Sequence, residues 1–366
     1  MLVLAAVAAG VVLLLVAGVM VWAFSGANKP QRIPSSSPSP APQARTIEAS
    51  TVGGWYAGAS GLGVRDGDFE KWLGQPVTIS GTWSDTDDAS QRELHTLVKE
   101  FKDWKGALDI AVGGTVLDTE ENYAAAANGE YDERWREAAK VIAKARENAE
   151  GPTFIRPFHE MNGNWYKSWM VTEENSDDFK KAFSRYAGIL REAMPKAYIS
   201  WSPNYSDHTK INVKYWYPGD DAVDCVAPDY YDDESTPARV DIDAWNSEAD
   251  DRDKYDNPKG PESWRQFAEE HGKPLCFPEW GLKPEGKGVD HPEWIKAVNA
   301  WMNTHANTAT WKLGDRIPQG ASGKVLYSVY FNVLHQDKAG FTIHGADANP
   351  KSEAVFPKLM WGNRKG

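Results

Sequence analysis

The stretch "FIRPFHEMNGNW", residues 154–165, decides the fold, because it joins the pattern of a buried strand directly to polar and aromatic residues. A core strand does not favour a carboxylate such as Glu160, and a solvated loop does not need an indole such as Trp165. In a parallel α/β barrel, however, the residues at the carboxyl ends of the strands face a common pocket. The stretch therefore predicts a barrel strand that ends in a functional site.

Short apolar runs like this one recur along the chain. We expect eight strands, at residues 55–59, 77–83, 108–113, 153–158, 198–203, 222–231, 274–278 and 325–332. Helical patterns lie between most of them, at residues 87–104, 131–149, 176–193, 261–271 and 291–305. Strands that alternate with helices pair in parallel, and eight such repeats can close on themselves. The prediction is an α/β fold, a (β/α)8 TIM barrel that forms a single catalytic domain over residues 51–366.

The helical pattern at residues 87–104 begins with Asp residues and has four apolar residues on one face: Leu94, Leu97, Val98 and Phe101. This spacing predicts one continuous amphipathic helix.

The N-terminal part of the chain has a different composition. Residues 2–24 form an uncharged run of 23 residues, long enough to span a bilayer. We expect residues 1–25 to be a transmembrane anchor or an uncleaved signal segment; a cleavable signal stays open, because small residues precede Asn28. Residues 26–50 are rich in Pro and Ser and predict a semi-rigid linker. This layout predicts an extracellular or cell-surface protein, secreted or membrane-anchored, that contacts the membrane through its N-terminal segment only.

The basic residues near the apolar run conflict with that orientation. Lys29 and Arg32 follow the run instead of preceding it, and the positive-inside rule would leave the rest of the chain in the cytoplasm. We therefore expect that the true start lies upstream or that another feature sets the orientation.

The composition also limits the partners. The formal net charge is −12, and no Lys/Arg-rich face is available to neutralise phosphates, which argues against a nucleic-acid partner. The chain has 17 Trp, 14 Tyr and 12 Phe, which serve as core residues or as flat platforms for sugar rings. Cys225 and Cys276 form neither a disulfide framework nor a metal-binding spacing. We expect buried free thiols, with one bridge as the alternative.

Two expected strands end in a glutamate, in "IRPFHE" and "LCFPEWG". Glu160 follows the fourth expected strand and Glu279 the seventh, so their side chains converge across the mouth of a barrel. Two convergent carboxyls are what cleavage of a glycosidic bond needs. Desolvation would favour the neutral form of Glu160, whereas Tyr231 and Arg156 are the expected partners that hold Glu279 as a carboxylate.

Other acidic residues are expected to have no catalytic role. Five of them lie in acidic loop runs that we expect to be solvated, with a loop-bound Ca²⁺ as the alternative: Asp220, Asp221, Asp232, Asp233 and Glu234. The "HE" pair lacks a second His at helical spacing, which excludes a zinc-protease motif. We expect no metal site and no cofactor.

The motifs "RPFHEMNGNWY", "WSPN" and "PEWG", after an opening "GGWYAGAS", resemble those of glycoside hydrolase family 26. That family consists largely of retaining endo-β-1,4-mannanases, whose two catalytic Glu lie on strands four and seven of a (β/α)8 barrel. The resemblance spans the globular part of the chain. Its first motif is specific, because most of this clan of enzymes has Asn before the acid/base Glu, where the family and this chain have His.

The resemblance implies roles for individual residues. It makes Glu160 the acid/base and Glu279 the nucleophile. The residues expected to bind substrate are His159, Trp165, Tyr231, Trp280, Asn204 and Trp83, and those expected to orient the machinery are Arg156 and Tyr231. Within these sets, the resemblance gives His159 a contact to the sugar beside the cleavage point and makes Trp165 the floor of a sugar subsite.

The expected function is that of a retaining endo-β-glycosidase, a monomer that hydrolyses β-1,4-mannan by double displacement. Two departures from the family pattern leave the substrate open. Trp280 stands where the family more often has Phe, and the second and third expected strands do not end in a family-type His. The alternatives are another glycan (β-glucan, xylan or the producer's own envelope polysaccharide) or a non-catalytic glycan-binding barrel.

Overall fold

The computed structural model describes residues 50–84, 87–232, 245, 248–283, 290–334 and 340–362. The expected anchor or signal segment and, apart from Ser50, the expected linker lie outside these residues. Within them, no helix is both long and apolar enough to cross a membrane.

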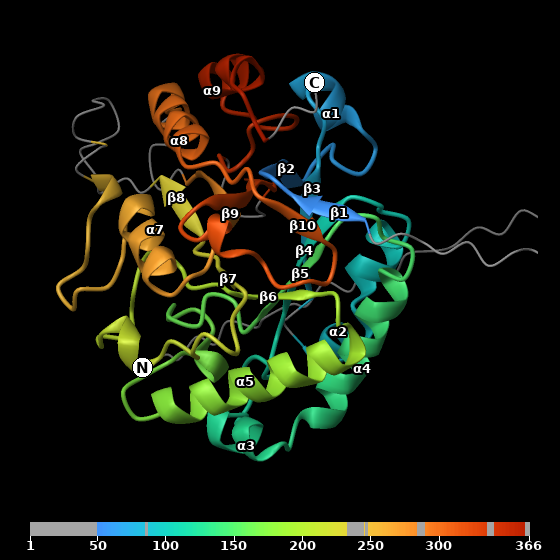
Figure 1. Ribbon diagram of the computed structural model, residues 1–366, viewed down its shortest axis with the longest axis vertical. Coiled ribbons are helices and arrows are strands. Elements are labelled where there is room, and N and C mark those ends of the chain that lie inside the picture. The colour runs from blue at the N-terminus through green and yellow to red at the C-terminus, as the bar shows by residue number, and fades with distance from the viewer. Residues whose placement is uncertain are drawn as a thin grey trace, which may run out of the picture. The chain divides into compact units, whose positions relative to one another are not determined.

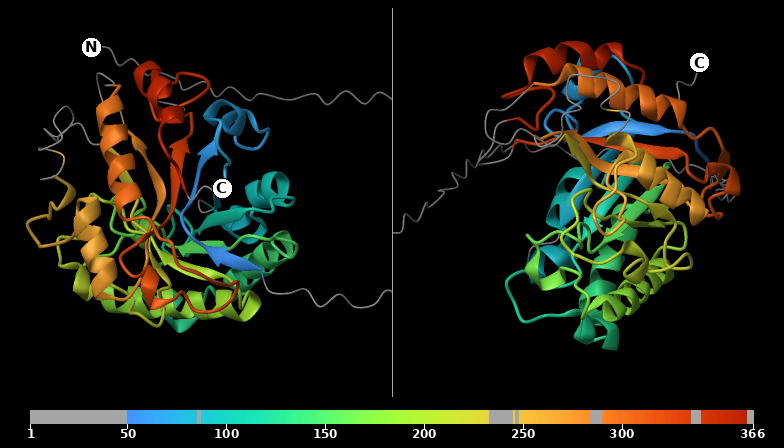
Figure 2. Two further views of the ribbon diagram at one scale, coloured as in Figure 1. Left: turned by 45° about the horizontal axis from the view of Figure 1, so that its top comes forward. Right: turned by 90° about the vertical axis from the view of Figure 1, so that its left-hand side faces the viewer.

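Parallel strands form a closed barrel at the centre of the molecule, as the sequence predicted (Figures 1 and 2). The described strands fill eight barrel positions in this order: β2 (Tyr56–Gly61), β3 (Ile79–Ser84), β4 (Ala107–Val112), β5 (Thr153–Pro157), β6 (Tyr198–Trp201), β7 (Cys225–Val226) together with β8 (Tyr230–Asp232), β9 (Leu275–Leu282) and β11 (Val325–Asn332). The parallel pairing of β11 with β2 closes the barrel.

The sixth barrel position differs from the prediction. Instead of one strand over residues 222–231, the short pieces β7 and β8 both pair with β9. Between them, Asp229 forms an isolated parallel bridge with Asn204. The strand is thus irregular where it approaches the carboxyl end of the barrel.

Helices surround the barrel (Figure 1). They are α1 (Asp68–Leu73), α2 (Asp88–Glu93), α3 (Tyr123–Asn128), α4 (Asp132–Ala145), α5 (Ser176–Ala193), α7 (Pro261–Glu270), α8 (Pro292–Thr304) and α9 (Pro350–Val355). The long helix α5 buries Phe179, Phe183, Tyr186 and Leu190, whose spacing of three to four residues is that of an amphipathic helix. Both α7 and α8 begin with Pro, a residue suited to the first helical turn.

The prediction of a continuous helix at residues 87–104 is wrong. Helix α2 ends at Glu93, Leu94 takes a left-handed conformation with φ of 44°, and a π-helical turn follows at Leu97–Phe101. This break rotates the next turn, so that Leu94, Leu97 and Phe101 are buried while Val98 is 44% exposed.

The amino end of the barrel is covered by a short antiparallel pair, β1 (Thr51–Gly53) with β10 (Thr310–Lys312). From this pair, the Trp311 indole donates a hydrogen bond of 2.8 Å to the hydroxyl of Tyr198, the first residue of β6. The carboxyl ends of the strands lie at the other end of the barrel.

The two cysteines lie on neighbouring strands, as expected. Cys225 is in β7 and Cys276 in β9, and both are buried and free.

Candidate active site

The chain turns sharply after β5 and thereby places Glu160. Phe158 and Glu160 both have left-handed backbones, with φ of 53° and 52°. The Glu160 N–H donates a 2.7 Å hydrogen bond to the carbonyl of Ser202, just after β6. Left-handed non-glycine residues cost free energy and concentrate at functional sites. The turn therefore fixes the acidic side chain at the carboxyl end of the barrel.

The loop after β4 packs against this turn. The Phe158 ring lies so close to Gly114, after β4, that a Cβ at Gly114 would lie 1.8 Å from the ring. Only glycine fits there. The Gly114 carbonyl accepts hydrogen bonds from Trp135 Nε1 at 2.9 Å and from Arg134 Nη2 at 3.2 Å.

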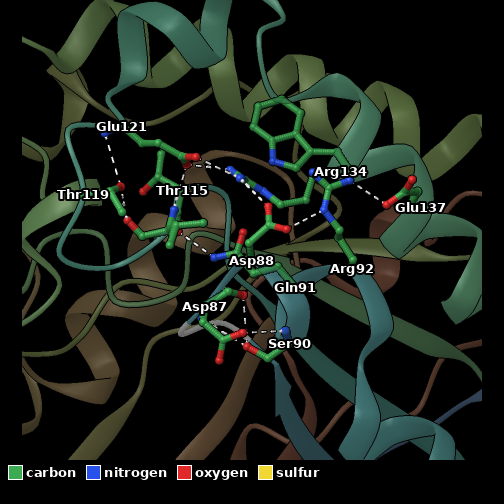
Figure 3. A network of polar contacts seen from close by, with 12 residues as sticks. Asp87, Asp88, Ser90, Gln91, Arg92, Thr115, Thr119, Glu121, Arg134 and Glu137 are labelled. Carbon is green, nitrogen blue, oxygen red and sulfur yellow. Dashed lines mark hydrogen bonds and ion pairs between the residues drawn. The ribbon is translucent and has the colours of Figure 1, made fainter.

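A polar network fastens the same loop to α2 and α4 (Figure 3). The buried Arg134 pairs with a carboxylate on each side. Its Nη2 lies 2.6 Å from Glu121 Oε2 in the loop, and its Nη1 lies 3.2 Å from Asp88 Oδ1 in α2. Gln91 of α2 donates a 2.6 Å hydrogen bond to the carbonyl of Thr115. The network thus holds the loop against which Phe158 packs, two residues before Glu160.

The Glu160 carboxyl accepts hydrogen bonds from two neutral donors. Asn204 Nδ2 lies 2.6 Å from Oε1, and Trp165 Nε1 lies 2.7 Å from Oε2. Burial raises the pKa of Glu160 to about 7, and the negative charge of Glu279 adds to the rise. Near neutral pH, Glu160 is therefore able both to give and to accept a proton. Ser202 and Arg156 link the two glutamates: the Ser202 carbonyl accepts from the Glu160 N–H, and the Ser202 hydroxyl accepts a 3.4 Å hydrogen bond from Arg156 Nη1, which also donates to Glu279.

Glu279 has different surroundings. It lies on β9 with 6% of its surface exposed. One oxygen accepts hydrogen bonds from Trp83 Nε1 at 2.5 Å and Arg156 Nη1 at 3.0 Å, and the other accepts one from the Tyr231 hydroxyl at 3.2 Å. The expected contacts from Tyr231 and Arg156 are present. Trp83, expected to bind substrate, donates to this carboxylate, and three donors stabilise its negative charge.

Two buried carboxyls, Asp109 and Asp229, lie beside Arg156, and the sequence analysis gave them no role in the site. Arg156 Nε pairs with Asp109 of β4 at 2.6 Å, and Asp109 also accepts a 2.7 Å hydrogen bond from the Tyr327 hydroxyl. Burial by itself lowers the pKa of Arg156, but the neighbouring carboxylates hold it well above its usual range. The signal that could have revealed Asp109 is its position in the middle of the apolar strand "ALDIAV".

Asp229 is the second buried carboxyl near Arg156, with 3.5 Å between Oδ1 and Nη1. Burial and then the charge of Glu279 raise the pKa of Asp229 well above its usual range. The raised pKa favours the neutral form of Asp229, which attracts the Arg156 guanidinium less strongly than a carboxylate does.

His159 lies beside Glu160 but faces aromatic side chains. It is 2% exposed, and its Nε2 lies 3.2 Å from the Tyr166 hydroxyl. Its ring lies 6.0 Å from that of Trp169, centroid to centroid. Burial and the charge of Arg156 lower the pKa of His159 well below its usual range, so the imidazole is neutral.

The assignment of Trp280 to the substrate site is wrong. Trp280 is 1% exposed, stacks on Phe356 with ring centroids 6.1 Å apart and packs against Trp361. Successive residues of a strand point to opposite faces. Because Glu279 points into the barrel, its neighbour Trp280 points out into the helix layer.

The acidic loop residues also depart in part from the expectation of simple solvation. Asp232 is buried and bonded to His291, and Asp220 lies 2.8 Å from His271 Nδ1. Asp221 is exposed, whereas Asp233 and Glu234 lie outside the described residues. Across the described part of the chain, no group of three or more His, Cys, Asp or Glu side chains is arranged to hold a metal ion.

A cavity of about 450 Å³ lies next to Trp165. The His208 ring meets the Trp165 ring edge-on, with centroids 5.6 Å apart. The cavity is lined by Asn164, Met170, Thr172, Glu173, Glu174, His208, Thr209, Lys210 and Ile211. Apart from neighbouring Trp165, the sequence analysis did not anticipate this feature, because its walls come from loops after two different strands.

One part of the chain matches the model of a known family. Residues 95–246, which include Glu160, match the model of glycosyl hydrolase family 26. None of the curated proteins matches the sequence.

Several solved structures are similar to this chain. A family 26 β-mannanase from Bacteroides ovatus is 18% identical, with a TM-score of 0.51 over 84% of this chain and 90% of that one. The family 26 domain of an endo-β-mannanase/endo-β-glucanase from Prevotella bryantii is 16% identical, with a TM-score of 0.48 over 83% and 88%. A β-mannanase from a symbiotic protist of the termite Reticulitermes speratus is 18% identical, with a TM-score of 0.48 over 84% and 86%. The first of these shows that the barrel fold is shared.

Proposed function

We propose that this chain, whose residues 95–246 match the model of glycosyl hydrolase family 26, is a retaining endo-β-glycosidase that hydrolyses β-1,4-mannan. The observation that carries the proposal is the contrast between the two glutamates in one site. Glu160 has a pKa of about 7, whereas Glu279 accepts hydrogen bonds from Arg156, Tyr231 and Trp83. Double displacement needs such a pair, one proton donor and one anionic nucleophile.

In the proposed first step, Glu279 attacks the anomeric carbon and the bond to the leaving oxygen breaks. That oxygen takes the proton of Glu160, and the sugar is left as an ester of Glu279. In the second step, ionised Glu160 takes a proton from water, whose oxygen attacks the same carbon. The bond to Glu279 breaks, so both glutamates return to their starting states.

The neighbouring residues have positioning roles in this proposal. Arg156, Tyr231 and Trp83 hold the nucleophile in place through the hydrogen bonds described above. Asn204 orients the proton donor, because its side-chain amide donates a hydrogen bond to Glu160 Oε1. Trp165, 43% exposed, offers an apolar surface to a sugar ring next to Glu160. The neutral His159, beside the acid, is proposed to contact a sugar hydroxyl.

Two observations support a neutral, β-linked substrate. The formal net charge of −12 disfavours the approach of a polyanionic glycan. The solved relatives are named as β-mannanases, which favours mannan among the neutral candidates. We propose that the enzyme acts outside the cell, as the uncharged segment at residues 2–24 suggests.

The test is to incubate the full chain with β-1,4-mannan, mixed-linkage β-glucan, β-1,3-xylan and isolated envelope polysaccharide, and to measure new reducing ends. We expect a mixture of oligosaccharides from mannan, formed with retained anomeric configuration in proton NMR. Release of monosaccharide alone would contradict endo action, and an inverted product would contradict double displacement. Cleavage of only another glycan would contradict the substrate, and binding without cleavage would favour a non-catalytic barrel.

A further inference from the structure

We propose that Asp109 and Tyr327, both buried in the barrel, are positioning residues for the nucleophile. The Tyr327 hydroxyl holds the Asp109 carboxylate, and Asp109 in turn orients Arg156 against Glu279. The proposal rests on the proposed function, because it explains how the proposed nucleophile is held in place. It adds two residues that stand in none of the motifs resembling the family, one on β4 and one on β11.

A line of short contacts runs from Glu279 to the Tyr327 hydroxyl. Arg156 Nη1 donates to Glu279 Oε1 at 3.0 Å, and Arg156 Nε donates to Asp109 Oδ1 at 2.6 Å. The Tyr327 hydroxyl donates to the other oxygen of Asp109 at 2.7 Å. Arg156, Asp109 and Tyr327 are each 0% exposed, so these hydrogen bonds are shielded from solvent. The position of Glu279 therefore depends on groups that it does not touch.

Asp109 makes a closer contact with Arg156 than the neighbouring polar groups do. Arg156 Nη1 lies 3.4 Å from the Ser202 hydroxyl and 3.5 Å from Asp229 Oδ1, whereas Nε lies 2.6 Å from Asp109. A guanidinium is a planar fork, so a close partner at Nε fixes the plane in which Nη1 points. Asp109 is therefore the partner that aims Nη1 at Glu279.

The Tyr327 hydroxyl keeps Asp109 suited to this task. Burial raises the pKa of Asp109 and the charge of Glu279 adds to the rise, whereas the charge of Arg156 and the Tyr327 hydroxyl oppose it. A hydrogen bond donated to a carboxylate favours its charged form. Removal of the hydroxyl would thus favour the neutral form of Asp109, which holds a guanidinium less strongly.

Stability alone does not explain an ion pair in this part of the barrel. The Tyr327 ring packs in an apolar core cluster with Phe154 and Val329, and its centroid lies 4.5 Å from that of Phe154. An ion pair in such surroundings loses its hydration, and apolar side chains of similar volume often stabilise a core equally well. The pair of Asp109 and Arg156 is better explained by the nucleophile that it holds.

The first test uses Tyr327→Phe, which removes the hydroxyl and keeps the ring. We expect kcat on β-1,4-mannan to fall about tenfold with KM unchanged, because a small displacement of a reacting group lowers the rate without weakening substrate binding. Tyr198→Phe is the matched control. The Tyr198 ring also packs on Phe154, with centroids 5.6 Å apart, but its hydroxyl accepts from Trp311 of β10. This control should lower Tm about as much as Tyr327→Phe and leave kcat unchanged.

A cycle of variants tests whether Tyr327 acts through Asp109. Asp109→Asn keeps the shape of the side chain and removes its charge, and it should lower kcat about 100-fold. If the hydroxyl acts only through Asp109, the double variant should lose no more than Asp109→Asn alone. Losses that multiply in the double variant would contradict this connection.

The rate of the first chemical step separates a misplaced nucleophile from a general defect. The probe is 2,4-dinitrophenyl 2-deoxy-2-fluoro-β-mannobioside. Its leaving group needs no proton and its fluorine slows the second step, so the release of dinitrophenolate reports attack by Glu279. Tyr327→Phe and Asp109→Asn should slow this release, and Tyr198→Phe should not.

Two results would overturn the inference, and they differ in what they leave standing. If Tyr327→Phe and Tyr198→Phe behave alike while the unaltered enzyme cleaves mannan, the positioning roles are wrong and the proposed function stands. If the unaltered enzyme forms no sugar ester with the probe, the proposed function and the positioning roles fall together.

Discussion

The two glutamates of this site each accept a hydrogen bond from an indole, but they differ in backbone setting and in the charge of their other donors. Glu279 lies within the barrel strand β9, where the register against β11 shifts, and is 6% exposed beside the guanidinium of Arg156. Glu160 lies beyond the end of its strand, on a left-handed residue, and its two donors are a neutral amide and a neutral indole. The negative charge of the first glutamate helps to raise the pKa of the second to about 7. Burial of the proton donor, together with a cation bonded to the other acid, thus suits the two glutamates to different roles.

The buried polar groups around Arg156 strengthen this asymmetry. Asp109 takes the Nε side of the guanidinium, with the Tyr327 hydroxyl as a further donor. Asp229, whose pKa burial raises well above its usual range, contributes no charge when protonated. Nη1 lies closer to Glu279, at 3.0 Å, than to Asp229, at 3.5 Å.

The largest expected effect comes from removing either carboxyl. Both Glu279→Ala and Glu160→Ala should lower kcat/KM on polysaccharide by at least about 10⁴-fold, because each removes a group that forms or breaks bonds in the transition state. With an activated aryl glycoside the two should differ. Only Glu160→Ala should still form the glycosyl-enzyme, since a good leaving group needs no proton.

Azide provides the control for this pair. It should rescue Glu160→Ala to give a glycosyl azide of retained configuration, whereas any azide product of Glu279→Ala should be inverted. The two configurations are distinguished by proton NMR. A retained azide product from Glu279→Ala would mean that the nucleophile has been assigned to the wrong residue.

A smaller effect is expected at the tyrosine that bonds to the nucleophile. Tyr231→Phe removes the 3.2 Å hydrogen bond to Glu279 and should lower kcat by about 10²-fold, the usual loss for one preorganised donor. Tyr230→Phe is the matched control, because the Tyr230 ring stacks on Trp294 of α8 with centroids 5.6 Å apart. Equal losses in the two variants, measured by steady-state kinetics, would show that the Tyr231 hydroxyl has no specific role.

The smallest effect is a shift in pH dependence. Glu160 must be protonated to act as acid, so kcat/KM should fall as the pH rises through about 7. The Trp165 indole stabilises the ionised form of Glu160, so Trp165→Phe should raise this pKa and move the basic limb to higher pH. Trp104→Phe, at an indole that donates to the Ala107 carbonyl, should leave the limb in place. A limb that moves to lower pH in Trp165→Phe would contradict this role of the indole.

The sequence predicted the barrel because strand and helix periodicity are local properties. The strand at residues 325–332 was placed with its full extent, since its apolar and aromatic run is continuous. The prediction of one continuous helix over residues 87–104 was wrong, because periodicity does not reveal the left-handed Leu94 that divides the pattern. The assignment of Trp280 to the substrate site was wrong for a related reason. The motif shows that Trp280 follows Glu279, but neighbouring side chains of a strand point to opposite faces.

By itself, the sequence determined the repeating strand and helix pattern, the two glutamates at strand ends, and an acidic, aromatic-rich composition, because each of these is read from neighbouring residues. Tertiary structure alone decided which oxygen of each glutamate meets which donor, how Asp109 and Asp229 divide the contacts of Arg156, and where a cavity opens beside Trp165. Most of these features join residues that are tens to hundreds of positions apart. Their energies depend on burial and on distances that exist only once the barrel has closed.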